Sequence, residues 1–267
     1  MKIFDCFTYC GEDELLELRL QELSNKVDYF VIIESSKYHS GKKKSQSFDI
    51  SKFYKYKNKI RYFYLKDMPQ HDGNNWTYEK YQRNQISKGL YDAEDEDIIL
   101  VSDVDEIPNL ENDLYIKSDS CVFLQNFYYY KFNILCYDGL KWKKKWPGSK
   151  SIKFKYFESA QNVRELRVKN IPFWRIDQKI KRQIINNGGW HFSYLMSPEK
   201  IAKKIENFAH KEFKNFSNIE LIKLAILEKK DIFSRGDLKF KVVEIDSSYP
   251  KTIKNNLEKY KEWIEKK

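Results

Sequence analysis

The chain has 267 residues, of which 16% are aromatic, whereas only 9 are Gly and 6 are Pro. This composition excludes a disordered, low-complexity or fibrous chain, and the length suits one large domain with a substantial core. An excess of 49 Lys and Arg over 39 Asp and Glu gives a net charge of +10, which favours an anionic partner (nucleic acid, acidic lipid or a phosphorylated small molecule) but is explained equally well by a lysine-rich surface.

In the first half of the chain, strand and helix patterns alternate. Apolar runs predict strands at 2–7, 27–34, 60–65 and 97–102, and helical patterns fall at 11–23 and 77–92. The first of these helices places Leu16, Leu20 and Leu23 on one face. Such alternation implies right-handed crossovers and an α/β fold, with a mostly parallel sheet and helices on both faces.

The second half changes character. An aromatic run at 121–135 and the alternation of Ile152, Phe154 and Tyr156 within 151–157 predict antiparallel strands. Helices are expected from 197 onward, and the basic tail at 249–267 is predicted to form a peripheral helix. No repeat and no Gly-, Pro- or Ser-rich linker divides the chain, so we expect a single domain.

The chain carries four cysteines and no recognisable targeting segment. The cysteines form no CxxC pair and have no histidines at zinc-site spacing: Cys6, Cys10, Cys121 and Cys136. The N-terminus lacks the apolar region of a signal peptide, and no run of about 18 apolar residues occurs. We therefore expect a soluble, reduced, cytoplasmic protein, whose charge would also suit peripheral docking at the inner face of an anionic membrane.

The stretch DEDIILVSDVDEIPNL (95–110) drives an apolar strand into three carboxylates, Asp103, Asp105 and Glu106. They fall just beyond the carboxyl end of the fourth expected strand, the edge at which open α/β sheets bind ligands. In extended backbone, residues 103 and 105 leave the same face, and two carboxylates there suit Mg²⁺ or Mn²⁺. The alternative is a solvated acidic turn before Pro108.

A cation with so few protein ligands would need a polyanionic substrate to complete its shell. A nucleotide-sugar diphosphate meets that need, because the cation would neutralise the departing nucleoside diphosphate. Two other classes compete with this hypothesis. One is a protein that binds single-stranded nucleic acid through KWKKKW (141–146), and the other is a metal-dependent phosphoesterase. The latter usually needs further Asp or His ligands for two metals, and this chain has only 4 His.

Several sequence blocks, in order, resemble glycosyltransferase family 17 over about residues 3 to 235. They are FDCFTYCGEDELLELRLQEL, VDYFVIIESSKYHSGKKK, YEKYQRNQISKGL, DEDIILVSDVDEIPNL and GGWHFSYLMSPEKIAKKIENFAHKE. The family includes the β-1,4-mannosyl-glycoprotein β-1,4-N-acetylglucosaminyltransferases, and a bacterial or viral type is expected here. The resemblance implies a Rossmann-like GT-A fold in one domain, 1–267. Its parts would be a nucleotide-binding half (1–110), an acceptor-side half (111–195) and a helical C-terminal part (196–267).

The resemblance also implies the reaction and its participants. It implies a metal-dependent inverting transfer of a sugar from a UDP-sugar, commonly UDP-GlcNAc, onto a saccharide hydroxyl. The acceptor would be an oligosaccharide or a lipid-linked glycan, and nucleic acid would not be a partner. One departure from the family pattern is His39, where relatives tend to carry Thr, which puts the contacts of that loop in doubt.

By the same resemblance, Asp103 and Asp105 match the DxD motif. The second Asp would bind the metal directly, and the first would reach the ribose or a metal-bound water. His191 would complete the metal site, as a late-chain His does in many GT-A enzymes, or it would be a stacking core residue. Glu106 matches the family as well, without an assigned role in the motif.

Donor contacts are expected from both ends of the chain. Glu34 would contact uracil or ribose, and the ring of Phe7 or Tyr9 would stack on uracil or pack in the core. Arg83 would form a salt bridge with Glu79, face the diphosphate or brace the DxD carboxylates. Of Lys204 and His210, which lie six apart and roughly opposed on one expected helix, Lys204 is assigned to the donor.

The acceptor side offers weaker signals. KWKKKW interleaves Trp142 and Trp146 with lysines, which suits an acceptor loop or a solvated hairpin. His210 with Glu212 would reach the acceptor or form a surface pair. An inverting transfer needs a general base. Five carboxylates are available, and we favour the first two: Glu106, Glu158, Asp138, Glu165 and Glu212.

Overall fold

The apolar runs of the first hundred residues form four parallel strands, β1 (Ile3–Tyr9), β2 (Tyr29–Ser35), β3 (Ile60–Leu65) and β4 (Ile98–Asp103), as the sequence predicts. Strand β1 lies between β2 and β4, and β2 pairs with β3. In this register Thr8 lies beside Asp103, and Tyr9 beside Glu34. The carboxyl ends of these strands therefore meet at one edge of the sheet.

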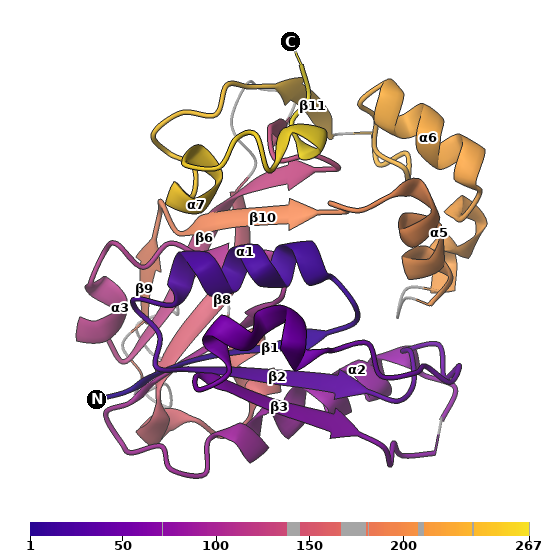
Figure 1. The fold of residues 1–267 in the computed structure, drawn as a ribbon. Coiled ribbons are helices and arrows are strands. Elements are labelled where there is room, and N and C mark those ends of the chain that lie inside the picture. The colour runs from indigo at the N-terminus through magenta and orange to yellow at the C-terminus, as the bar shows by residue number, and fades with distance from the viewer. Residues whose placement is uncertain are drawn as a thin grey trace, which may run out of the picture.

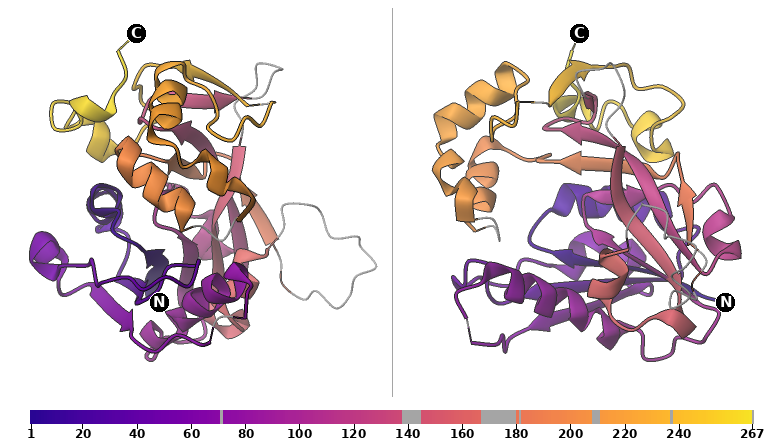
Figure 2. Two further views of the ribbon diagram at one scale, coloured as in Figure 1. Left: turned by 90° about the vertical axis from the view of Figure 1, so that its right-hand side faces the viewer. Right: turned by 180° about the vertical axis from the view of Figure 1, so that it is seen from behind.

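Helices cover both faces of these strands, and Figure 2 shows them on opposite sides. One face carries α1 (Asp13–Leu23) and the 3₁₀ helix η1 (Ile50–Tyr56); Leu16, Leu20 and Leu23 of α1 are buried in its core. The other face carries α2 (Asn75–Asn84) and the 3₁₀ helix η2 (Gln85–Gly89), which covers Val31. The prediction of an α/β fold is confirmed.

The computed structural model describes residues 1–70, 72–137, 145–166, 180, 182–207, 211–236 and 238–266. The described residues form one mixed sheet of eleven strands, whose main path runs β11–β7–β6–β8–β4–β1–β2–β3 (Figure 1). Strands β5 and β10 pair with each other, β10 also pairs with β6, and β9 pairs with β6. The sheet thus continues from the parallel half into the second half of the chain.

The second half is more broken than its sequence suggests. The aromatic run at 121–135 forms two antiparallel strands, β6 (Ser120–Tyr129) and β7 (Ile134–Tyr137), because the chain turns at Tyr130, whose φ is 63°. Strand β8 (Lys145–Lys153) is antiparallel to β4 and β6, as expected. It ends before Phe154, where the alternating pattern gives way to the 3₁₀ helix η3 (Phe154–Tyr156). Helix α3 (Leu114–Lys117) precedes β6, and helix α4 (Ala160–Arg164) follows η3.

Three short strands complete the site-bearing part of the sheet: β5 (Glu106–Pro108), β9 (Arg182–Ile185) and β10 (Gly189–Ser193). Helices follow, as predicted: α5 (Pro198–Glu206), η4 (Lys211–Phe216) and α6 (Ile219–Leu227). In Figure 1 α5 and α6 stand together beyond the end of β10. No helix in the described ranges is long and apolar enough to cross a membrane.

The tail corrects the prediction of a peripheral helix. After β11 (Lys239–Val242) the described residues, which end at 266, form two short helical pieces, α7 (Lys251–Lys254) and η5 (Lys261–Trp263). Its apolar side chains Tyr249, Ile253 and Tyr260 are buried in the core that lies against α1. The many basic residues of this segment make its apolar pattern hard to recognise in the sequence. The apolar side chains close the core.

Candidate active site at the β4–β5 turn

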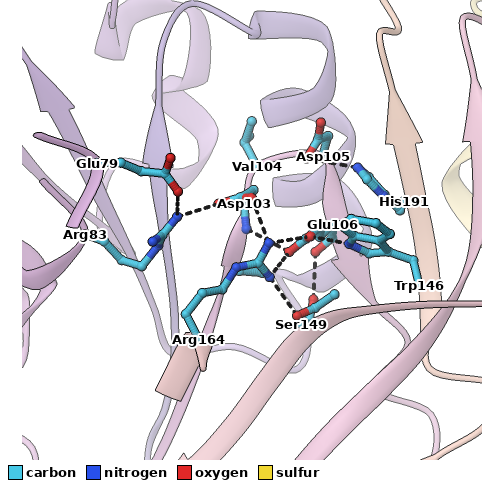
Figure 3. A network of polar contacts seen from close by, with 12 residues as sticks. Glu79, Arg83, Asp103, Val104, Asp105, Glu106, Trp146, Ser149, Arg164 and His191 are labelled. Atoms are coloured by element: carbon cyan, nitrogen blue, oxygen red, sulfur yellow. Dashed lines mark hydrogen bonds and ion pairs between the residues drawn. The ribbon is translucent and has the colours of Figure 1, made fainter. Parts of the chain in front are cut away.

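The acidic motif occupies a turn between two strands. Strand β4 ends at Asp103, residues 104 and 105 form the turn, and β5 begins at Glu106. The backbone is therefore not extended through Asp105, and the expectation that Asp103 and Asp105 leave one face loses its premise. In Figure 3 the two carboxylates face different partners.

Asp103 faces two arginines. Arg164 Nη2 lies 2.9 Å from Asp103 Oδ2, and Arg83 Nη2 lies 3.6 Å from Oδ1. The side chain of Asp103 remains 38% exposed. Burial alone would raise the pKa of the Asp103 carboxyl, but the Arg164 and Arg83 charges outweigh burial and hold the pKa below its usual value. Asp103 is thus an ionised carboxylate that solvent can reach.

Arg83 combines two of the three predicted roles. Its Nη2 makes the i,i+4 salt bridge to Glu79 at 2.5 Å and also lies near Asp103. Its Nη1 donates a hydrogen bond to Gln161 of α4 at 2.6 Å. Arg83 therefore braces the motif from α2, while a contact with diphosphate stays a prediction.

Asp105 faces a different pair of cations. Its Oδ1 lies 3.6 Å from His191 Nε2, and its Oδ2 lies 3.8 Å from Lys204 Nζ. Burial opposes ionisation of Asp105, yet the His191 and Lys204 charges hold the pKa of its carboxyl well below the usual range. Strand β10 and helix α5 thus converge on the second carboxylate of the motif.

The sequence left two roles open for His191, that of a stacking core residue and that of a metal ligand, and its contacts suit both. Its ring stacks on Phe127, with centroids 4.7 Å apart, and lies 5.0 Å from the Trp146 ring. The same ring reaches Asp105. Its Nδ1 is buried and has no hydrogen-bond partner within the described part of the chain, whereas a metal-bound His usually donates from its second nitrogen.

Lys204 of helix α5 also lies close to the Asp105 carboxylate. Its ammonium group lies 3.6 Å from Glu12 as well as near Asp105, and its side chain is 27% exposed. Burial would lower the pKa of Lys204, but the Asp105 and Glu12 carboxylates raise it above its usual value, so the charge is retained. His210, predicted to oppose Lys204, lies outside the described residues.

The contacts of Glu106 in this structure argue against the predicted role as general base. Its buried carboxylate accepts hydrogen bonds from both Nη atoms of Arg164, at 2.6 and 2.8 Å, and from Trp146 Nε1 at 2.6 Å. The backbone N–H of Asp103 donates a further bond at 3.0 Å. A carboxylate offers about four acceptor positions, so Glu106 has none left for a substrate proton. Its role is to anchor the turn.

The other candidate bases lie apart from this cluster or beyond the described residues. Glu158 is exposed and accepts a hydrogen bond from Asn162 at 2.6 Å, and no described contact joins it to Asp103 or Asp105. Glu165 is also exposed and lies 3.9 Å from Lys80. Asp138 and the side chain of Glu212 lie outside the described residues. A base role for Glu158 stays a prediction.

Three predicted donor contacts are part of the fold instead. Phe7 is fully buried beneath the Arg19 guanidinium, 4.5 Å from its ring centroid, so its ring is not open to a uracil. Tyr9 is 1% exposed and donates a hydrogen bond to Asp13. Glu34 is fully buried, and four donor residues saturate it: Lys44, Ser47, Phe48 and Tyr62.

Three residues of the site were not singled out from the sequence for these roles. Arg164 joins Asp103 to Glu106, and Arg19 binds the backbone of the turn from below. The ring of Trp146, a residue expected on an acceptor loop, packs beside the ring of His191. Trp142 of that loop lies outside the described residues. His39 lies against α2, with Nε2 3.3 Å from Gln82 Oε1. Of Arg164, Arg19 and Trp146, only Arg19 carried a signal in the sequence for its role, because it is a charged residue on an apolar helix face.

Asp105 and His191 can supply two ligands to one divalent cation. Ligand atoms bound at about 2.1 Å to one octahedral ion lie about 3.0 Å apart when adjacent and about 4.2 Å apart when opposite. Asp105 Oδ1 and His191 Nε2 lie 3.6 Å apart, so they would have to draw about 0.6 Å closer to bind one octahedral ion as adjacent ligands. Among the described residues no group of three or more His, Cys, Asp or Glu side chains could hold a metal. Substrate oxygens and water would have to complete the shell.

Comparison with known proteins bears on this site. A family model described as Glycosyltransferase family 17 matches residues 1–248. A search of curated proteins found no match to the chain. The matched range contains both carboxylates of the motif together with Arg83, Arg164 and His191, and it ends before the buried tail.

Proposed function

This chain belongs to glycosyltransferase family 17 and is therefore a glycosyltransferase, and we propose that it transfers GlcNAc from UDP-GlcNAc, with inversion, onto a saccharide hydroxyl of a glycan acceptor. The observation that carries this proposal is the pair formed by Asp105 and His191 at the end of β4. It provides two ligands at the sheet edge where α/β folds bind nucleotides. The acceptor would be an oligosaccharide or a lipid-linked glycan.

We propose that the cation is Mn²⁺ rather than Mg²⁺. The donor set combines a carboxylate oxygen with an imidazole nitrogen. Mg²⁺ takes oxygen ligands almost alone, whereas imidazole suits transition metals and carboxylate suits Mn²⁺. Bound between Asp105 and His191, the cation would stabilise the negative charge of the departing diphosphate.

The remaining residues of the site would orient the donor. Lys204, which is charged and partly exposed, would add positive charge beside the diphosphate. Asp103 is fixed by Arg83 and Arg164 and keeps exposed oxygens, so it would accept hydrogen bonds from the ribose or from bound water. The arginines would thus keep Asp103 in place while Asp105 takes the metal.

A thermal-shift experiment with UDP, GDP and ADP, each with and without Mn²⁺, tests the proposal. We expect UDP to raise the unfolding midpoint only when Mn²⁺ is present; ligand at about 100 times its Kd stabilises a protein by about 2.7 kcal/mol. Asp105→Ala should lose this stabilisation and the turnover of UDP-GlcNAc. The control is Asp113→Ala, an exposed carboxylate that makes no capping hydrogen bond ahead of α3.

Two outcomes would contradict the proposal. If Asp105→Ala keeps Mn²⁺-dependent stabilisation by UDP and normal turnover, then Asp105 is not the ligand. If GDP or ADP stabilises the wild type better than UDP does, the donor assignment is wrong. Substituting Mg²⁺ for Mn²⁺ in the same series tests the choice of metal separately.

A further inference from the structure

Arg19 is a fully buried arginine on a helix otherwise packed with leucines. It lies on the face of α1 that meets the sheet, and none of its surface is exposed. Its guanidinium rests on the Phe7 ring and pairs with Asp5 of β1 through two hydrogen bonds, Nε to Oδ2 at 2.7 Å and Nη2 to Oδ1 at 2.6 Å. These contacts fix the plane of the guanidinium.

The free edge of that guanidinium reaches the backbone of the β4–β5 turn. Arg19 Nη1 donates to the carbonyl oxygens of Asp103 at 2.9 Å, Val104 at 3.3 Å and Glu106 at 3.0 Å. The remaining carbonyl, that of Asp105, accepts the N–H of Phe192 in β10 at 2.9 Å. Every backbone carbonyl from 103 to 106 therefore has a donor.

The turn needs hydrogen-bond donors for its carbonyl groups, and Arg19 supplies them. A buried carbonyl without a donor is costly, and three carbonyls converge here on one side chain. Stability alone does not require an arginine, because apolar residues can often replace a buried ion pair without loss. What an apolar residue could not do is hold three carbonyls in one orientation.

We propose that Arg19 is a positioning residue for the glycosyl transfer: it fixes the backbone of residues 103–106 so that the Asp105 carboxylate stays beside His191 and Lys204. The proposal rests on the proposed metal-binding role of Asp105. Arg19 itself touches no ligand, since it lies below the turn and is fully buried. Asp5 and Phe7 serve as its anchor and its platform.

Arg19→Lys is the variant that tests this proposal. Lysine keeps the charge and can still pair with Asp5, but one ammonium group cannot bind Asp5 twice and three carbonyls together. We expect the Kd for Mn²⁺, measured calorimetrically in the presence of UDP, to rise about tenfold or more. We also expect faster amide hydrogen exchange at residues 103–106 in the metal-free protein.

Arg61→Lys is the matched control. Arg61 also pairs twice with a carboxylate, that of Asp92, and donates to the Gly89 carbonyl at 2.8 Å. It lies on β3, which is separated from β4 by β1 and β2. This control should lower the unfolding midpoint while leaving the Mn²⁺ affinity and the exchange at 103–106 unchanged. A purely structural Arg19 would behave in the same way.

The outcomes separate this proposal from the proposed function. If the wild type shows no Mn²⁺-dependent binding of UDP, the proposed function fails, and no metal-binding turn is left to position. If the wild type binds and folded Arg19→Lys binds equally well, only the positioning role is overturned. If Arg19→Lys does not fold, Arg19→Gln combined with Asp5→Asn removes both buried charges and takes its place, with the same expectations.

Discussion

Asp103 and Asp105 stand two positions apart in the sequence, but their positive partners differ in kind. Asp103 faces the guanidinium groups of Arg83 and Arg164, which hold it in an ion-pair network. Asp105 instead faces the His191 imidazole at 3.6 Å and the single ammonium group of Lys204 at 3.8 Å. We therefore assign the proposed cation to Asp105 rather than to Asp103.

Lys150 supplies a test of the same network through pH. Its buried ammonium group donates to the Arg164 carbonyl, and burial together with the Arg164 charge lowers the pKa of Lys150 to about 8. An unfolded lysine has a pKa of about 10.4 and so binds more protons than folded Lys150 between about pH 8 and 10. Stability should therefore rise with pH across this window, by up to about 3 kcal/mol.

Urea unfolding at pH 8, 9 and 10 measures this rise, and Lys150→Met should flatten the curve by removing the titrating group. Titrations elsewhere in the molecule are common to both proteins, so the difference between wild type and variant isolates Lys150. Parallel curves for the two proteins would show that Lys150 titrates like an exposed lysine.

At the residue level, site residues that are neighbours in the sequence could be predicted. Contacts between residues that are distant in the sequence were missed. Asp103 and Asp105 share one stretch, so the motif and its place at the end of β4 were predictable. Arg164 lies 61 residues from the Asp103 carboxylate that it binds, and no local pattern marks it. Glu34 was placed correctly at the ligand edge, but the chain at 44–48 folds back onto its carboxylate and closes it.

At the level of elements, predictability follows burial. Strands β1, β2 and β4 are buried on both faces and β3 is half-buried at the sheet edge, and their apolar runs were read correctly. The break between β6 and β7 falls at Tyr130 and involves neither Gly nor Pro, which leaves no local signal. Strands β5 and β10 are too short for a period-two pattern, yet β10 carries His191 opposite Glu106 of β5.

Gly189 sets the contact between these two strands. Its φ is +121°, and a Cβ there would lie 2.1 Å from the Ile107 carbonyl oxygen. Gly189→Ala should lower the free energy of unfolding by at least about 2 kcal/mol, because both backbone strain and a clash with β5 oppose it. Chemical denaturation measures the change.

Gly236→Ala is the control for this prediction, because a Cβ at Gly236 meets no atom of the described residues within 4 Å. Its effect should stay within about 0.5 kcal/mol. Equal costs for the two alanines would mean that β5 yields readily to β10, and that the position of His191 is not set by this pairing.

At the scale of the whole molecule, the site joins parts that are distant in the chain. The parallel half supplies the β4–β5 turn and Arg83, and the second half supplies Arg164, Trp146 and His191. Strand β8 connects these halves by pairing with both β4 and β6. The location of the acidic motif could thus be predicted from one segment, whereas its surroundings required the complete sheet.

The tail, which follows the matched family range, also joins parts that are distant in the chain. Residues after 248 return to the N-terminal half, where the Thr252 N–H donates to Glu22 of α1 at 2.8 Å. The Tyr249 ring lies 5.3 Å from Tyr128, and Tyr260 lies 5.4 Å from Phe132. These contacts tie α1, which carries Arg19, to the strand β6 that lines the other half.

Two alanine variants within the tail test whether it is part of the core. Ile253 is fully buried, whereas Leu257, four residues further on, is 47% exposed. Ile253→Ala should cost about 2 to 4 kcal/mol of unfolding free energy, because it removes buried methyl groups and leaves a cavity. Leu257→Ala should cost less than about 1 kcal/mol. Urea denaturation of both variants measures the difference; if the two costs are equal and small, the tail is peripheral, as its basic sequence had predicted.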